Sequence, residues 1–195
     1  MSDTWNLPNV LTMLRIVAVP FFVWACLVGG FNGADSLVAA WVAFALFVAA
    51  MITDKLDGDI ARSRGLVTNF GKIADPIADK SLMIAALVCL NIIGELSVWV
   101  SVIIIVRELG ITVWRMVLLR RGTVVAASKG GKIKTTLQAV AVGLYLAVLP
   151  GWMAIPTVVV MWCAVFVTVV TGIQYIVDNQ RLQRQTGGSD TSALH

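Results

Sequence analysis

Two pairs of aspartates, Asp54/Asp57 and Asp75/Asp79, lie within 26 residues of a 195-residue chain that is otherwise mostly apolar. Residues three or four positions apart lie on the same face of an α-helix. If two helices carry these pairs and their faces meet, four carboxylates share one small volume, where they cannot all stay ionised without compensation. Divalent cations such as Mg²⁺ or Mn²⁺ supply that compensation, since they prefer oxygen ligands and keep positions open for substrate phosphates. The spacing therefore predicts a metal site. Helix capping would explain one or two aspartates, but not two in-phase pairs.

The residues around these pairs follow the pattern D-x2-D-G-x2-A-R-x8-G-x3-D-x3-D without departure. Its fixed positions are Asp54, Asp57, Gly58, Ala61, Arg62, Gly71, Asp75 and Asp79. The small residues Gly58 and Ala61 leave little bulk beside the carboxylates, so a pyrophosphate could approach the backbone there. The whole pattern resembles the motif of the CDP-alcohol phosphatidyltransferases, integral membrane enzymes of phospholipid synthesis.

The resemblance implies a role for each position of the motif. Asp54, Asp57, Asp75 and Asp79 would hold one or two Mg²⁺ or Mn²⁺ ions, and Asp79 would also be the catalytic base. The nucleotide part of CDP-diacylglycerol would bind at Asp57, Gly58, Ala61, Arg62 and Gly71. The family resemblance also suggests a homodimer.

The composition predicts a membrane protein. Hydrophobic residues make up 58% of the chain and charged residues 13%, and several apolar runs approach the roughly 20 residues that a spanning helix needs. The formal net charge of +4 requires no nucleic-acid partner, because the positions of the basic residues explain it. The only histidine is His195, which makes histidine-based catalysis improbable. The three cysteines lie within apolar runs, and we expect no disulfide.

The predicted fold is all-α: a polytopic bundle of six transmembrane helices in one domain, residues 9–180. An interfacial segment (1–8) precedes this domain, and a polar, disordered tail (181–195) follows it. The six expected spans run from about residue 9 to 29, 37 to 54, 72 to 93, 98 to 119, 135 to 149 and 157 to 177.

The basic residues predict the orientation of the bundle. Turns after the first, third and fifth spans contain no lysine or arginine, whereas the loops after the second and fourth spans and the C-terminal segment are basic. Basic loops stay on the cytoplasmic side. Both termini and the aspartate motif would therefore face the cytoplasm from a bacterial inner membrane.

Two charged residues, Arg107 and Glu108, interrupt the fourth span. Ionisable residues at membrane depth are costly and mark functional sites by default, although a structural ion pair between helices is the alternative. Arg107, Lys132 and Lys134, with Arg115 and Arg15, are the candidate ligands of an acceptor phosphate, and Glu108 would orient them. Snorkelling explains Arg15 equally well, and Lys132 and Lys134 could simply be cytoplasmic charges.

Four further segments resemble the bacterial subgroup of this family whose acceptor is glycerol 3-phosphate. They are Asn6–Arg15, Asp75–Lys80 (D-P-I-A-D-K), Val106–Leu109 (V-R-E-L) and Gly131–Gln138 (G-K-I-K-T-T-L-Q). Synthesis with another acceptor, such as inositol phosphate, serine or phosphatidylglycerol, is the alternative on the same scaffold. A membrane prenyltransferase and a metal-ion transporter fit less well. The former needs aspartate motifs far apart in sequence, and the latter needs carboxylates at mid-membrane.

Overall fold

The structure, a computed structural model, consists of α-helices throughout the part of the chain that it describes. This part comprises the backbone of residues 7–31, 36–63, 69–120 and 129–189, and the side chains of residues 10–30, 36–54, 80–114, 116–118, 131 and 133–177. The helices are α1 (Leu7–Phe31), α2 (Ser36–Ser63), α3 (Asn69–Ile92), α4 (Val98–Arg120), α5 (Lys129–Leu146) and α6 (Ala154–Ser189), with a short 3₁₀ helix, η2 (Gly151–Met153), before α6. The prediction of six helices from the apolar runs is confirmed.

Helix α6 is longer than the expected span. The apolar run ends near Val177, but the helix continues to Ser189. Neither glycine nor proline occurs in residues 178–186, and the polar residues there are compatible with a helix. Much of the segment expected as a polar tail is therefore helical, whereas residues 190–195 lie outside the described part. The division into a core domain and flanking segments stays a prediction.

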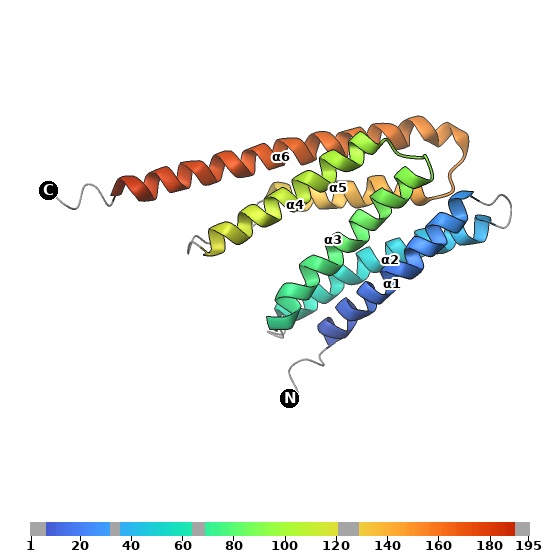
Figure 1. Cartoon of the computed structure of the whole chain (residues 1–195), viewed down its shortest axis with the longest axis horizontal. Coiled ribbons are helices and arrows are strands. Elements are labelled where there is room, and N and C mark those ends of the chain that lie inside the picture. Colours follow the sequence, from blue (N-terminus) through green and yellow to red (C-terminus); the bar gives the residue numbers. More distant parts are fainter. Residues whose placement is uncertain (1–6, 32–35, 64–68, 121–128, 190–195) are drawn as a thin grey trace.

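The helices form two groups of three, α1–α3 and α4–α6 (Figure 1). In the first group α1 packs along both α2 and α3, and in the second group α6 packs against α5 and α4. Helix α5 joins the groups by contacting α2 and α3, and α3 also contacts α4. Helix α6 extends past its neighbours at the end where α4 finishes (Figure 1). A site built from α3, α4 and α5 therefore lies where the two groups meet.

A continuous apolar core connects the two groups. Phe22 of α1 and Phe47 of α2 are buried, with ring centroids 6.2 Å apart. Leu87 of α3, Ile104 of α4 and Met161 of α6 belong to the same cluster. Small residues between these large ones let the helices approach closely, which maintains the dense packing of a protein interior.

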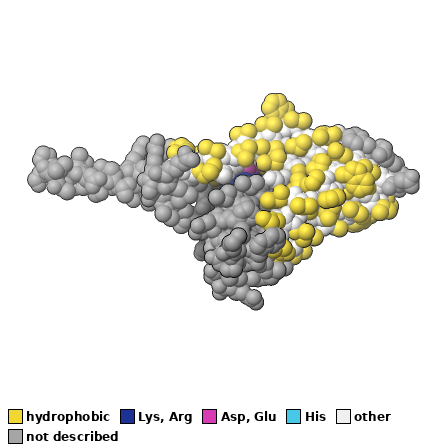
Figure 2. Space-filling model, turned by 60° about the horizontal axis from the view of Figure 1, so that its bottom comes forward, with side chains coloured by type: hydrophobic (Ala, Val, Ile, Leu, Met, Phe, Trp, Pro, Cys, Tyr) yellow, Lys and Arg dark blue, Asp and Glu magenta, His cyan; other side chains and the backbone are white. Residues whose placement is uncertain are grey.

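The outer surface is also apolar. Many large hydrophobic side chains are exposed, including Trp99, Trp152 and Ile155, and they cover much of the described face in Figure 2. Among the described residues, three segments are long and apolar enough to cross a membrane: Val10–Gly30, Ser36–Asp54 and Gly151–Val177. The helical parts Lys80–Ile92 and Ile133–Leu146 are also apolar but shorter. A surface of this kind is unfavourable in water and suits lipid, so the chain is a membrane protein.

The expected turn between the third and fourth spans is present. Gly94 has φ +83°, a left-handed conformation that a side chain would strain. The Asn91 side chain donates a hydrogen bond to the Leu96 carbonyl oxygen at 2.8 Å, which closes the turn. This turn directs the chain from α3 into α4.

Substitution of Gly29 by alanine should destabilise the packing of α1 on α2. A Cβ atom at Gly29 would lie 2.7 Å from the backbone nitrogen of Ala40 and 2.8 Å from its Cα atom, so the helices would have to separate. Overpacking of this kind costs about 1–3 kcal/mol, more than the helix propensity gained. We expect a lower midpoint of thermal unfolding in detergent. The matched control is Gly110→Ala in α4, where a Cβ atom meets nothing within 4 Å; an equal loss of stability in both variants would contradict the explanation.

Candidate functional site

The two aspartate pairs lie on two consecutive helices, as the spacing predicts. Asp54 and Asp57 are one turn apart in α2, and Asp75 and Asp79 are about one turn apart in α3. The end of α2 and the start of α3 lie at the same end of the bundle (Figure 1). Gly58, Ala61 and Arg62 belong to α2 and Gly71 to α3. Of all these residues only Asp54 has a described side chain, so the contacts of the rest stay predictions.

Asp54 is held by a buried arginine from the first helix. The guanidinium group of Arg15 donates a hydrogen bond to Oδ1 of Asp54 at 2.6 Å. The Arg15 side chain is almost fully buried, whereas that of Asp54 is 34% exposed. Arg15 therefore compensates one carboxylate of the motif, which is the kind of charge balance that a cluster of aspartates requires. A role of Arg15 on the acceptor phosphate stays a prediction.

A second charged cluster joins α4 to α5. Glu108 lies between two cations, and its Oε1 atom accepts hydrogen bonds from Lys134 and, at 3.3 Å, from Nη1 of Arg107. Lys134 is only 4% exposed. Buried charges of this kind persist where they are paired and hydrogen-bonded. The Arg107–Glu108 contact that the sequence left as an alternative is thus present within α4, and Glu108 also pairs with Lys134 of α5, a partner that the sequence did not predict.

Arg107 is bound on its other side to α6. Its Nε atom donates a hydrogen bond to the Thr168 carbonyl oxygen, and its Nη2 atom donates one to Oγ1 of Thr171, both at 3.2 Å. Gln138 of α5 donates a hydrogen bond to Oγ1 of Thr168 at 2.8 Å. These bonds satisfy polar groups that lipid could not satisfy. The guanidinium group is therefore held between its own helix α4 and α6.

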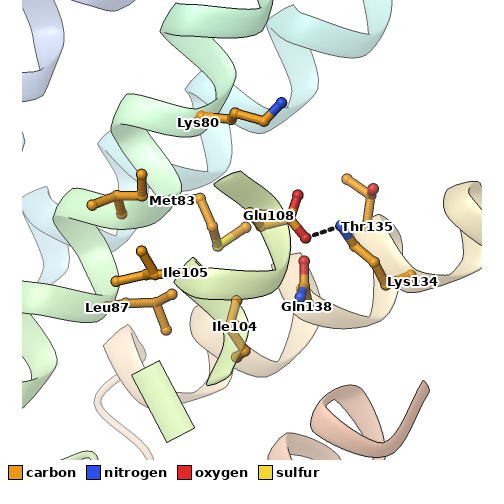
Figure 3. Close-up of a pocket in the computed structure, with 10 residues that line it drawn as sticks. Lys80, Met83, Leu87, Ile104, Ile105, Glu108, Lys134, Thr135 and Gln138 are labelled. Carbon is orange, nitrogen blue, oxygen red and sulfur yellow. Dashed lines mark hydrogen bonds and ion pairs between the residues drawn. The ribbon is translucent and has the colours of Figure 1, made fainter. Parts of the chain in front are cut away.

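A pocket opens beside this cluster, between α3, α4 and α5 (Figure 3). Lys80 extends toward it from α3, while Glu108 from α4 and Lys134 from α5 meet at another side. Thr135 and Gln138 add polar groups, and Met83, Leu87, Ile104 and Ile105 are among its apolar lining residues. Lys80 directly follows Asp79 in the sequence. The pocket thus includes the residue that follows the second aspartate pair in the sequence, and Lys80 and Lys134 give it positive groups that an anion could contact.

The other candidate cations also lie on these helices. Arg115 belongs to α4 and Lys132 to α5. Their side chains are outside the described residues, so their roles stay predictions. The structure therefore brings together Arg107 and Lys134, with Glu108 between them, and places Arg15 with Asp54.

Comparison with protein families agrees with this architecture and motif. The model of the family described as CDP-alcohol phosphatidyltransferase matches residues 5–170, which is most of the chain. The chain belongs to this family.

Several curated members of the CDP-alcohol phosphatidyltransferase family are similar over nearly their whole length. A protein of Mycobacterium tuberculosis named probable phosphatidylglycerophosphate synthase is 48% identical over 183 residues, covering 94% of this chain and 84% of that protein. A Bacillus subtilis protein named CDP-diacylglycerol–glycerol-3-phosphate 3-phosphatidyltransferase is 42% identical, covering 90% and 95%. A Haemophilus influenzae protein of the same name is 33% identical, covering 88% and 92%.

Several polar or small residues of this CDP-alcohol phosphatidyltransferase site were absent from the sequence prediction. Thr168, Thr171 and Gly172 lie on one face of α6, and Gln138 lies one turn after Lys134 on α5. A signal for them exists in the sequence, since three- and four-residue spacing of polar or small residues within an apolar run marks a face that is not directed to lipid. Their partner on α4 could not be read from the sequence.

Replacement of Gly172 by alanine should impair acceptor use without affecting the donor. The new Cβ atom would lie 3.3 Å from both Cγ and Nε of Arg107, which would shift the guanidinium group by a few tenths of an ångström. Small displacements of positioning groups reduce rates markedly. We expect an increase of several-fold in KM for the acceptor and an unchanged KM for the donor, measured by CMP release. Gly110→Ala is again the control, and equal effects of both substitutions would contradict this role for Gly172.

Proposed function

We propose that this enzyme transfers the phosphatidyl group from CDP-diacylglycerol to glycerol 3-phosphate, giving phosphatidylglycerophosphate and CMP. The observation that carries the proposal is the pair of cations, Lys80 and Lys134, that line the pocket, together with Arg107, which pairs with the pocket residue Glu108. Such a pocket suits an acceptor that carries a phosphate, since arginine binds phosphate in a bidentate manner and lysine adds a point charge. The names of the relatives agree with this acceptor.

The donor would enter from the membrane. Its acyl chains would remain in lipid beside the exposed apolar helix faces, while its CDP group would reach the motif at the end of α2 and the start of α3. Gly58, Ala61, Arg62 and Gly71 are the residues proposed to shape the nucleotide pocket. The acceptor would approach from the pocket between α3, α4 and α5.

A divalent cation, Mg²⁺ or Mn²⁺, fits the donor set of the motif. Four carboxylates on two adjacent helix ends provide the oxygen ligands that these ions prefer, and the proposed ligands are Asp54, Asp57, Asp75 and Asp79. The pairing of Asp54 with Arg15 supports the need for positive charge at this position. When bound, the metal would neutralise charge on the pyrophosphate.

The residues of the chain would then carry out an in-line displacement. Asp79 is proposed to accept the proton of the 1-hydroxyl group of glycerol 3-phosphate. That oxygen forms a bond to the phosphorus atom that carries diacylglycerol, and the bond from this phosphorus to the CMP oxygen breaks. Arg107 and Lys134 would hold the acceptor phosphate, so that its hydroxyl group is correctly placed for attack.

Membrane orientation and assembly are further parts of the proposal. The basic loops support six membrane-spanning helices with both termini and the site on the cytoplasmic side. Accessibility of a tag after His195 to protease in sealed, right-side-out and inverted vesicles would test the orientation. A homodimer is proposed from the family resemblance, and the mass of the detergent-solubilised protein would test it.

The test of the proposed reaction is CMP release from CDP-diacylglycerol by purified protein in detergent with Mg²⁺. Glycerol 3-phosphate, inositol 1-phosphate, serine and phosphatidylglycerol are supplied separately, with glycerol as the matched acceptor that lacks a phosphate. We expect release with glycerol 3-phosphate and its loss on chelation. Release with a different acceptor alone would overturn the assignment of the acceptor but keep the donor chemistry.

A further inference from the structure

Glu108 occupies the position that an anionic substrate group would need. Its carboxylate contacts Lys134 of α5 and Arg107 of its own helix, the two cations proposed for the acceptor phosphate. It also lines the pocket between α3, α4 and α5. The pocket has space for little more than a water molecule, so a phosphate needs lining side chains to move, and Glu108 is the anionic side chain among them.

The alternative role, that Glu108 orients Arg107, is weakened by the contacts of Arg107 with α6. Its guanidinium group already donates hydrogen bonds to the Thr168 carbonyl oxygen and to Oγ1 of Thr171. These two bonds come from a different helix and do not depend on Glu108. The carboxylate instead bridges to Lys134, which is 4% exposed, and buried charges of this kind are stabilised by paired, hydrogen-bonded partners.

We infer that Glu108 is a displaceable counter-ion that occupies the acceptor-phosphate site whenever no phosphate is bound. This inference rests on the proposed function. An incoming phosphomonoester replaces the carboxylate on Lys134, because a doubly charged phosphate interacts more strongly with Lys134 and Arg107 than a singly charged carboxylate does. No bond is formed or broken in this exchange.

The same exchange aids product release. The product of the proposed reaction still carries the acceptor's phosphomonoester, which must leave the cations that bound it. Return of the Glu108 carboxylate to Lys134 supplies the replacement for that phosphate. Glu108 therefore weakens binding of the phosphate in substrate and product alike, and it keeps Lys134 and Arg107 paired with a carboxylate between turnovers.

The test compares Glu108→Gln with wild type. Glutamine keeps the size of the side chain and can still accept a hydrogen bond from Lys134, but it cannot compete as an anion. We expect KM for glycerol 3-phosphate to fall about tenfold and kcat to fall several-fold, since release of the product becomes slower. The dissociation constant of inorganic phosphate, measured from its protection of the protein against thermal unfolding, should also fall about tenfold.

Two further variants keep the inference falsifiable. Glu108→Asp keeps both charges paired but shortens the reach to Lys134, so we expect the phosphate dissociation constant to fall less than in the glutamine variant. The control is Glu95→Gln, which removes an exposed carboxylate in the turn before α4 and should leave all three constants unchanged. Weaker phosphate binding or a higher acceptor KM in either Glu108 variant would overturn the inference and assign Glu108 an orienting role.

The two readouts separate this inference from the proposed function. Absence of CMP release with glycerol 3-phosphate in the wild type would contradict the proposed function. Inorganic phosphate binding would still decide the role of Glu108, because this measurement needs neither the donor nor turnover. Wild-type protein that binds no phosphate at any concentration tested would overturn the inference by itself.

Discussion

Replacement of Asp79 by asparagine is expected to lower the rate of CMP release by about 10²–10⁴-fold, the range that a positioned general base contributes. Asparagine has nearly the same size and keeps one oxygen ligand, but it cannot accept the proton of the attacking hydroxyl group. Binding of CDP-diacylglycerol should remain detectable, because three aspartates of the motif are unchanged. The measurements are single-turnover CMP release and donor binding to the detergent-solubilised variant.

A control variant, measured at a raised Mg²⁺ concentration together with the Asp79 variant, distinguishes loss of the base from loss of a metal ligand. Asp54→Asn should weaken binding of the metal, so a higher Mg²⁺ concentration should restore part of its activity. The Asp79 variant should gain little under the same conditions, since its defect lies in proton transfer. Turnover of the Asp79 variant at the wild-type rate would eliminate this residue as the base, and full recovery at high Mg²⁺ would leave it only a role in metal binding.

The helices were the part of the fold that could be predicted best from the sequence. Long apolar runs separated by short polar turns predict spanning helices directly, and the turn around Gly94 was found in this way. The end of α6 could not be predicted in this way, because the apolar signal stops at Val177 while the helix continues to Ser189. Hydropathy reports where a helix enters lipid, and it does not report where the helix itself ends.

The interaction partners of the charged residues could not be predicted as well as the helices. Spacing within a helix predicts which side chains share a face, so the aspartate pairs on α2 and α3 could be assigned. It does not predict which residue of another helix a charge meets. Arg15 was predicted to be either an acceptor ligand or a snorkelling residue, and its pairing with Asp54, 39 positions away, could not be read from the spacing. The contacts of Arg107 with Thr168 and Thr171 likewise depend on how α4 packs against α6.

Replacement of Lys134 by methionine should have the second large effect, on the acceptor alone. Methionine fills similar space without the charge, so a bound phosphate would lose one buried cation. Loss of one partner of a buried charged pair costs about 2–5 kcal/mol, which corresponds to roughly 30- to 4,000-fold in binding. We expect kcat/KM for glycerol 3-phosphate to fall within this range, mainly through KM, while KM for CDP-diacylglycerol stays within about twofold.

The double variant Lys134→Met/Glu108→Gln tests whether this loss is specific to the phosphate site. When Lys134 alone is removed, the Glu108 carboxylate can still pair with Arg107. This pairing hinders binding of the phosphate at Arg107. Removal of both charges should therefore recover part of the lost kcat/KM, by a factor of about ten if the two residues are coupled.

Arg184→Met in the last part of α6 is the control for loss of a basic residue elsewhere. Additive effects of the two substitutions would show that Lys134 and Glu108 act independently, and an equal loss in the Arg184 variant would show that the effect reflects net charge.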